Sequence, residues 1–395
     1  MKLFYIANIR MPTERAHGIQ VAKMCEAFAR QGAEVTLLVP DRKTFDADPF
    51  SYYAVERNFS IEKIPVPDSV GLGKVGFLIE SLVFAWRAAR RVLSYSSFSK
   101  GGGQRPEDFK NPSTHQNVVL PLKKGESDII VYTREELPLL LLPKGTRAFY
   151  EMHQLRGSFL QQFVKKALGI IAITGGLKRA LSARGYPSKQ ILVAHDAVDL
   201  EQFNIPVSKE EARKHLGLPL EDKIALYIGG FEAWKGLKTV LQASKTLQER
   251  GIRTVVVGGT PKEIVGLQKQ YRETTFLGYR PYAELPLIQR AADVLLVPNS
   301  GKERISREFT SPLKLFAHMA SGVPIVASDL PSLREVLSER EAIFFTPDDP
   351  QSSVSAVMQA LAPEAVVRAE AATSKVRECT WDKRAQRILE FVKIP

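Results

Sequence analysis

The sequence predicts an α/β protein built from two domains, each with a doubly wound parallel sheet. The chain has 395 residues, 44% of them hydrophobic, which is enough for two buried cores and too much for one. Short apolar runs alternate with helical patterns in both halves, as in parallel sheets connected by helices. A polar segment with Pro206 and Pro219 separates the two halves.

The N-terminal domain is expected to span residues 1–200. It opens with the apolar run Leu3–Ala7, which is too short for a signal peptide and is predicted to be a buried strand. Further strands are predicted at Val35–Val39, Asp128–Arg134, Ala148–His153, Ile170–Thr174 and Ile191–Ala194. Three of them end on a polar residue (Arg134, His153 or Thr174), at the sheet edge where ligands bind in open parallel sheets.

Residues 94–125 interrupt the apolar rhythm with successive glycines and polar residues, so we expect a mobile surface insertion there. The segment before it has an apolar helical pattern with basic neighbours: Val75, Leu78, Leu82, Trp86 and Leu93, then Arg87, Arg90, Arg91, Lys100 and Arg105. This pattern is typical of a core helix with a solvated edge. It is also compatible with a helix that lies on an anionic membrane surface.

The formal net charge is +12, which points to nucleic acid, an anionic membrane or acidic small ligands as partners. No nucleic-acid-reading module is recognisable, so nucleic acid is not expected; a steep salt dependence of binding would reveal it. Cys25 and Cys379 are far apart in sequence, and neither has a second cysteine or a histidine at metal-ligand spacing, so a reducing cytosol is the default and no metal site is expected. We expect a cytoplasmic protein, with peripheral association at the inner membrane face as a second expectation.

The C-terminal domain is expected to span residues 201–375, followed by a helix at 376–395 that begins near Trp381 and packs at the domain junction. Its predicted strands are Ile224–Ile228, Val255–Val257, Thr275–Leu277, Val294–Val297, Ile325–Ala327 and Ala342–Phe345.

The stretch Phe309–Phe316 predicts a helix start that can bind an anion. Ser311 is a good N-cap, Pro312 suits the first helical position, and the helix should end near Gly322. The free N–H groups and the hydroxyls of Thr310 and Ser311 form a cradle for a phosphate. An ordinary capped helix has the same appearance, so this feature alone does not decide the function.

The stretch Tyr227–Gly236 predicts a second contact for an anion. The strand ends at Ile228, and Gly229 and Gly230 allow the backbone to approach a ligand. Lys235 follows just before a helix and can neutralise a leaving diphosphate, although most lysines are solvated surface residues. The first strand and helix of the chain lack the glycine-rich motifs of dinucleotide-binding and P-loop proteins.

Together with Pro298–Ser300 and Gly322–Asp329, these stretches resemble the C-terminal domain of the retaining glycosyltransferases of family four. The resemblance extends to Met1–Arg42, Ile170–Phe203 and the segment from Trp381 onward. It implies the GT-B fold, two facing Rossmann-like domains with a cleft between them. It also implies a hexosyltransferase that needs no cofactor and no metal, and that moves a sugar from a UDP- or GDP-sugar to a carbohydrate or lipid-linked acceptor in surface polysaccharide or glycolipid assembly.

The resemblance assigns roles to individual residues. Lys235 matches the lysine that contacts the donor diphosphate, and His153 matches the histidine that faces the transferred sugar. The implied donor-binding residues are Gly18, Gly229, Gly230, Lys235, Gly278, Tyr279, Thr310, Ser311, Pro312 and Leu313. His17, Arg134 and Asn299 are candidate contacts for the sugar or the acceptor.

The chain departs from the family pattern at two carboxylates and one basic residue. The paired glutamates of the family would fall at Phe309 and Ala317, and the basic residue that often precedes the lysine falls at Gly230. Glu308 is kept as a catalytic candidate, although a shift of one residue turns a helical side chain by about 100°. His318 is the nearest polar residue to Ala317.

These departures leave other functions open. Because no carboxylate pair is present, double displacement through a covalent intermediate is disfavoured. We expect instead that the diphosphate departs from, and the acceptor attacks, the same face of the sugar. A weakened or inactive GT-B homologue that acts as a binding or scaffold protein is one alternative. A sugar-nucleotide epimerase or a phosphorylase is another, but the acid and base that an epimerase needs on both sides of a sugar cannot be named in this sequence.

Overall fold

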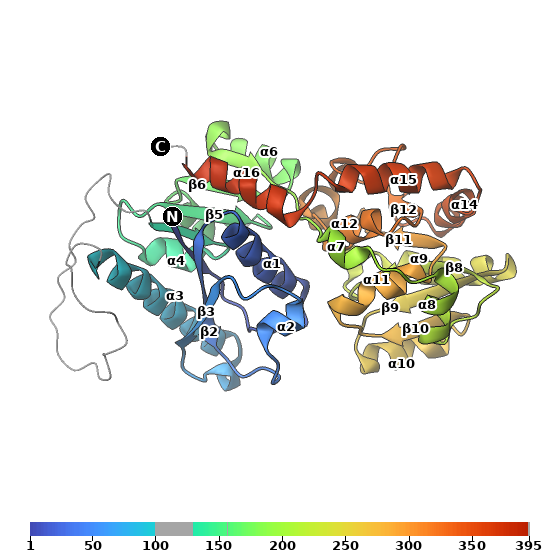
Figure 1. Cartoon of the computed structure of the whole chain (residues 1–395), viewed down its shortest axis with the longest axis horizontal. Coiled ribbons are helices and arrows are strands. Elements are labelled where there is room, and N and C mark those ends of the chain that lie inside the picture. The colour runs from blue at the N-terminus through green and yellow to red at the C-terminus, as the bar shows by residue number, and fades with distance from the viewer. Residues whose placement is uncertain (99–128, 156, 394–395) are drawn as a thin grey trace. The chain divides into compact units, whose positions relative to one another are not determined.

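The computed structural model describes residues 1–98, 129–155 and 157–393 (Figure 1). Within these residues there are two parallel sheets, one of seven and one of six strands. The chain divides into two compact units. The N-terminal unit comprises the described residues of Met1–Ile171, Tyr186–Leu192 and Leu389–Pro395, and the C-terminal unit comprises Ala172–Gly185 and Val193–Ile388. The predicted fold class, two α/β domains with parallel sheets, is confirmed, whereas the boundaries at residues 200 and 375 stay predictions.

The sheet of the N-terminal unit has the strand order β3-β2-β1-β4-β5-β6-β7. Its strands are β1 (Lys2–Ile6), β2 (Glu34–Asp41), β3 (Ser60–Pro65), β4 (Ile129–Thr133), β5 (Ala148–Met152), β6 (Gly169–Ala172) and β7 (Ile191–Val193). Strand β1 pairs in parallel with both β2 and β4, so that Tyr5 lies opposite Leu37 and Tyr132. Strand β3 was not predicted, because this edge strand is half exposed and has no apolar run.

The helices of the first half lie between these strands or, in the case of α7, after the last of them. They are α1 (Ala16–Arg30), α2 (Pro49–Tyr53), η1 (Val70–Leu72), α3 (Gly73–Phe98), α4 (Glu136–Leu141), α5 (Ser158–Val164), α6 (Gly175–Ser182), η3 (Ser188–Gln190) and α7 (Leu200–Phe203). The connections β1-α1-β2 and β3-α3-β4 move along the sheet in opposite directions. Right-handed crossovers therefore place α1 and α3 on opposite faces. Of the insertion predicted at 94–125, residues 94–98 form the end of α3 and the others lie outside the described residues.

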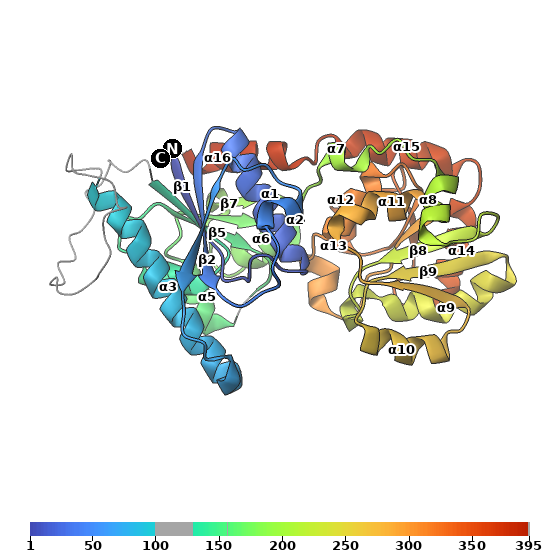
Figure 2. The same ribbon diagram turned by 60° about the horizontal axis from the view of Figure 1, so that its bottom comes forward.

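The sheet of the C-terminal unit has the order β10-β9-β8-β11-β12-β13. Its strands are β8 (Lys223–Ile228), β9 (Ile252–Val257), β10 (Thr274–Gly278), β11 (Val294–Val297), β12 (Ile325–Ser328) and β13 (Ile343–Phe345). The helices and turns of this half are α8 (Lys209–Leu216), η4 (Ala233–Lys235), α9 (Leu237–Glu249), α10 (Pro261–Gln270), η5 (Tyr282–Glu284), α11 (Leu285–Arg290), η6 (Ile305–Phe309), α12 (Leu313–Ala320), α13 (Pro331–Arg334), α14 (Pro350–Ala360), α15 (Ala365–Val376) and α16 (Trp381–Lys393). Figure 2 shows the sheet between α9 and α10 on one side and α11 and α12 on the other.

Two cores hold these layers together. Val240 and Leu241 of α9 and Val357 of α14 pack on one face of the sheet, while Leu315 and Phe316 of α12 pack on the other. The predicted helix at Trp381 is present as α16, with Ile388, Leu389 and Val392 buried; its place at the domain junction stays a prediction. None of the helices in the described parts of the chain has the length and apolar character needed to cross a bilayer.

Candidate functional site

The glycine turn after β8 is closely packed against the neighbouring loops. The N–H of Gly229 donates to the Val257 carbonyl oxygen at 2.9 Å, and the Tyr227 hydroxyl donates to the Gly230 carbonyl oxygen at 2.7 Å. A Cβ on Gly258 would lie only 2.0 Å from the Gly229 oxygen. The ends of β8 and β9 therefore approach each other more closely than side chains would allow. The approach of a ligand to the Gly229–Gly230 backbone stays a prediction.

Lys235 ends the short turn η4, and Gly236 joins it to α9. The Lys235 Nζ lies 2.9 Å from a carboxylate oxygen of Glu232, and the lysine side chain is 24% exposed. Gly236 has φ of +74°, and a Cβ there would lie 1.7 Å from the Pro298 carbonyl oxygen. The glycine thus lets the loop after β11 contact the start of α9, which places Lys235 at the carboxyl edge of the sheet.

The start of α12 differs from the prediction by one residue. Pro312 occupies the N-cap position instead of the first helical position, and Ser311 does not cap the helix. The Ser311 hydroxyl instead accepts a hydrogen bond from the Asp196 N–H at 2.9 Å. Ser311 is therefore occupied by a structural contact, because its hydroxyl binds the backbone between β7 and α7. The helix end is as predicted, with Ser321 as C-cap and Gly322 at φ of +72°.

The positions of the missing glutamates are both buried. Phe309 ends the π-helical turn η6, and Ala317 lies on α12; they are 5% and 1% exposed. The Glu308 carboxylate pairs with the guanidinium groups of Arg304 at 3.0 Å and Arg307 at 4.0 Å. His318 is fully buried beside Gln289, and burial lowers its pKa to about 3. It therefore belongs to the core and cannot replace the carboxylate missing at Ala317.

The other predicted donor residues of this unit lie at strand ends. Gly278 ends β10 with φ of +73° and accepts a hydrogen bond from Gly258 at 2.8 Å, and Tyr279 is about half exposed. Asn299, just after β11, is completely buried, and its amide nitrogen and oxygen have no hydrogen-bond partner among the described residues. A buried amide without partners is costly, so Asn299 is a polar group that a ligand or a water molecule would satisfy.

In the N-terminal unit, Glu151 organises a cluster of polar side chains. Its carboxylate accepts hydrogen bonds from Gln20 and Tyr132 and lies 2.7 Å from the Nε2 of His153. Arg134 donates to the Gln20 oxygen at 2.8 Å. The network therefore links two of the predicted strand-end residues, Arg134 and His153. Thr174, the third, is instead fully buried and caps α6.

The residues at the start of α1 have clear structural contacts. Burial, followed by the nearby positive charge of Arg134, lowers the pKa of His17 to about 4, so His17 is neutral near pH 7. A Cβ on Gly18 would lie 2.3 Å from the Tyr53 hydroxyl. That hydroxyl donates to the carbonyl oxygen of Thr13 and accepts from its N–H. Gly18 is therefore required for packing against Tyr53, whatever its role toward a ligand.

Three residues of these clusters were not predicted from the sequence: Glu151, Glu232 and Lys314 of α12. Glu151 had a detectable signal, because it is a carboxylate inside a strand that is otherwise apolar and fully buried. Glu232 and Lys314 had none, since charged residues next to a loop or in a helix are ordinarily solvated. No group of three potential metal ligands occurs in the part of the chain that the structure describes.

The two parallel-sheet units define the chain as a protein of the GT-B fold. The structure of HepE from Anabaena, solved with UDP and glucose, is similar over 100% of both chains, with a TM-score of 0.70 and 14% identity. At this identity the likeness shows the fold alone. A comparison with protein families matches residues 222–363 to the glycosyl transferases group 1. The matched segment contains the glycine turn, Lys235 and α12.

Curated relatives match the chain over part of their length. A D-inositol 3-phosphate glycosyltransferase from Corynebacterium urealyticum is 28% identical over 254 residues, which is 59% of this chain and 58% of the relative. TuaC from Bacillus subtilis, whose name links it to teichuronic acid biosynthesis, is 24% identical over 249 residues, or 62% of this chain and 59% of the relative. The chain thus matches a little under three fifths of the length of these relatives. The expected family and fold are confirmed, while retention of configuration stays a prediction.

Proposed function

We propose that the protein transfers a sugar from a nucleoside diphosphate sugar to a hydroxyl acceptor. The observation that carries this proposal is Lys235 at the glycine turn of β8, inside the segment that matches the glycosyl transferases group 1. The known complex of HepE with UDP and glucose supports a UDP-linked donor, although a GDP-linked one remains an alternative. No resident cofactor is part of the proposal.

The proposed reaction requires that the charge developing on the leaving diphosphate be stabilised. As the bond between sugar and phosphate breaks, the leaving diphosphate gains negative charge and the sugar becomes oxocarbenium-like. Lys235 would stabilise the diphosphate by direct electrostatic contact, so the reaction needs no metal ion. The acceptor proton would pass to the departing phosphate on the same face of the sugar, which retains the configuration. His153, held by Glu151 at 2.7 Å, would position the transferred sugar.

The test of this function is calorimetry with a panel of UDP- and GDP-sugars, followed by product analysis with oligosaccharide and lipid-linked acceptors. Binding together with transfer and an unchanged anomeric configuration is the expected result. Binding without turnover would support the alternative of a catalytically inactive binding protein, which the buried Phe309 and Ala317 favour. Conversion of the donor into a sugar epimer would support the epimerase alternative. Absence of binding to every donor would contradict the proposal.

We also propose that the acceptor belongs to a surface polysaccharide or glycolipid, and that the enzyme works on an anionic membrane surface. The supporting feature is α3, the long helix at the outside of the N-terminal unit (Figures 1 and 2). Its large apolar side chains point outward: Val75 is 65% exposed, Leu78 53% and Trp86 47%, with Ile79 and Leu82 also exposed. Its buried face carries Phe84 and small residues such as Ala85, Ala88 and Ala89. An exposed apolar row of this kind marks an interaction surface.

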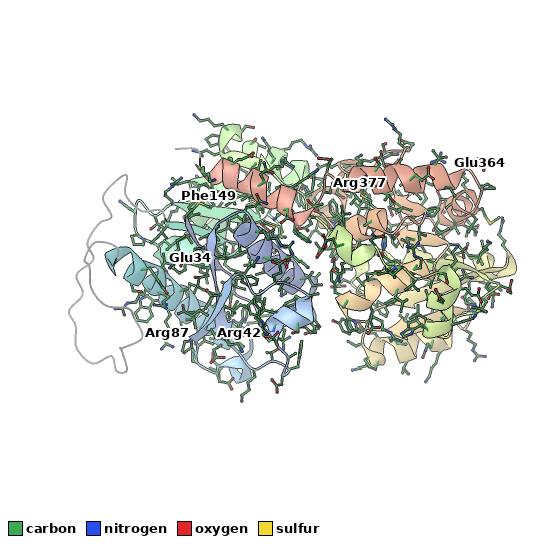
Figure 3. All side chains as sticks on the ribbon, viewed as in Figure 1. Glu34, Arg42, Arg87, Phe149, Glu364 and Arg377 are labelled. Carbon is green, nitrogen blue, oxygen red and sulfur yellow. The ribbon has the colours of Figure 1, made fainter. Side chains whose placement is uncertain are left out.

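The charges around this row favour an anionic partner. Arg90 stacks over the Trp86 ring at 4.8 Å, and Arg87, labelled in Figure 3, donates to the Pro65 carbonyl oxygen at 2.7 Å. The only carboxylate in the sequence of α3 is Glu80, which is buried and paired with Arg42. Apolar side chains bordered by arginines, with no exposed acid on the helix, suit the interface of an anionic bilayer.

A double variant, Leu78→Glu with Trp86→Glu, should reduce binding to phosphatidylglycerol vesicles by about tenfold or more, because each change removes an apolar group from the lipid. A double variant with Val366→Glu and Val367→Glu is the matched control, since both residues are exposed apolar side chains of α15. Vesicle sedimentation measures the binding of both double variants and of the wild type. Equal loss in both variants, or no binding of the wild type to these vesicles, would refute the membrane surface. If the wild type is a dimer and only the α3 double variant is a monomer, α3 is a contact between two copies of the chain and not a membrane surface.

A further inference from the structure

Lys314 has a buried amino group without a hydrogen-bond partner. It lies in the first turn of α12, its side chain is partly buried, and its Nζ is fully buried beside the Tyr227 ring at 4.6 Å. No described residue accepts a hydrogen bond from this Nζ. A buried ammonium without an anion is strongly unfavourable, so the group either loses its proton or acquires an anionic partner.

Two lysines converge on the glycine turn. A Cβ on Gly229 would lie 3.6 Å from the Lys314 Nζ, and a Cβ on Gly230 would lie 2.8 Å from the Lys235 Nζ. Both amino groups therefore lie against consecutive residues of one turn. The Lys235 Nζ lies 2.9 Å from a carboxylate oxygen of Glu232. The Lys314 Nζ makes no hydrogen bond to this carboxylate. The charge of Lys235 acts on Lys314, so two ammonium groups at this turn repel each other unless an anion with more than one negative charge joins them.

The surrounding groups determine the protonation of Lys314. Burial has the largest effect and the positive charge of Lys235 adds to it, so the pKa of Lys314 is lowered to about 7 although Glu232 acts in the opposite direction. From β8, the Tyr227 hydroxyl stays neutral, because burial raises its pKa. On the next turn of α12, His318 also stays neutral at pH 7, since its pKa is lowered to about 3. The only anion among these groups, Glu232, does not keep Lys314 protonated at pH values well above 7.

We propose that Lys314 and Lys235 form a two-lysine site for the diphosphate of a nucleotide at the Gly229–Gly230 turn, and that Lys314 takes up a proton from solvent when the diphosphate binds. The neutral amine of the free protein becomes an ammonium ion in the complex, and no bond of the nucleotide is broken. The identity of the ligand rests on the proposed function. The glycines matter here because a Cβ on Gly230 would lie 2.8 Å from the Lys235 Nζ, and a Cβ on Gly229 would lie 2.9 Å from the Tyr227 hydroxyl.

The experiment is calorimetric titration of the full chain with UDP and with GDP at pH 7 and pH 8.5, in buffers of different ionisation enthalpy. With the pKa near 7 in the free protein, proton uptake should rise from about one half per bound nucleotide at pH 7 to nearly one at pH 8.5. The affinity of the wild type should fall about 15-fold over the same range. Lys314→Met and Lys314→Arg should abolish both effects, since neither residue exchanges a proton there.

The two variants also separate this inference from a folding defect. Lys314→Met removes a buried amine and should unfold at a temperature no lower than the wild type. Lys314→Arg should bind the nucleotide with an affinity that does not depend on pH in this range. Binding of UDP or GDP without proton uptake, or with uptake that persists in both variants, would refute the role of Lys314 and leave the proposed function intact. If neither nucleotide binds the wild type at pH 7, the proposed function fails as well.

Discussion

Replacing Lys235 with alanine should lower kcat by about 10²- to 10³-fold, the usual effect of removing one group that stabilises charge in a transition state. The Lys235 Nζ sits at the carboxyl edge of the sheet, 2.9 Å from Glu232, and the neighbouring Gly229 and Gly230 carry no side chains. The ion pair itself contributes little to folding, because Glu232 is 57% exposed and such pairs are worth about 1 kcal/mol or less. Steady-state kinetics with the donor found in the binding panel measures the effect.

Lys238→Ala is the matched control for this variant. Lys238 lies on α9, one turn after Lys235, and is exposed to solvent. It carries the same charge, so its removal changes the net charge equally without touching the glycine turn. We expect its kcat to stay within about twofold of the wild type, since exposed charges act weakly at a distance. Equal turnover in the Lys235→Ala variant and the wild type would overturn the central assignment.

Strands and turns could be predicted from the sequence, because they depend on residues that are close together in the chain. Apolar runs located all the strands of the second sheet, and Gly229 and Gly230 marked the turn that follows β8. Runs of buried residues in parallel strands are visible in sequence because both faces of the sheet are covered. The family resemblance, carried by the same stretches, is confirmed by the match at residues 222–363.

Features that depend on distant contacts could not be predicted. Ser311 has the residue type and position of an N-cap, but the Asp196 N–H, 115 residues away, takes its hydroxyl. His318 is the nearest polar residue to Ala317 in sequence, but its burial against Gln289 depends on tertiary packing. Lys314 resembled any helical lysine, since only tertiary packing brings its Nζ under Tyr227. The roles of the individual site residues stay predictions for this reason.

Gly236→Ala should destabilise the C-terminal unit by about 3 kcal/mol or more, because two penalties act together. Its φ of +74° costs an alanine about 1–2 kcal/mol. In addition, the new Cβ would lie 1.7 Å from the Pro298 carbonyl oxygen, a backbone atom, so the loop after β11 or the start of α9 must move. Urea unfolding followed by circular dichroism measures the loss.

Gly251→Ala isolates the first penalty. Gly251 also has φ of +74°, but no atom lies within 4 Å of the position its Cβ would take. This variant should lose only about 1–2 kcal/mol, the cost of a left-handed alanine. It should also bind nucleotides normally, whereas Gly236→Ala should bind them more weakly, because the displaced segment carries Lys235. If the two variants are equally stable, the contact between the start of α9 and Pro298 is looser than described, and Lys235 is not held in place by it.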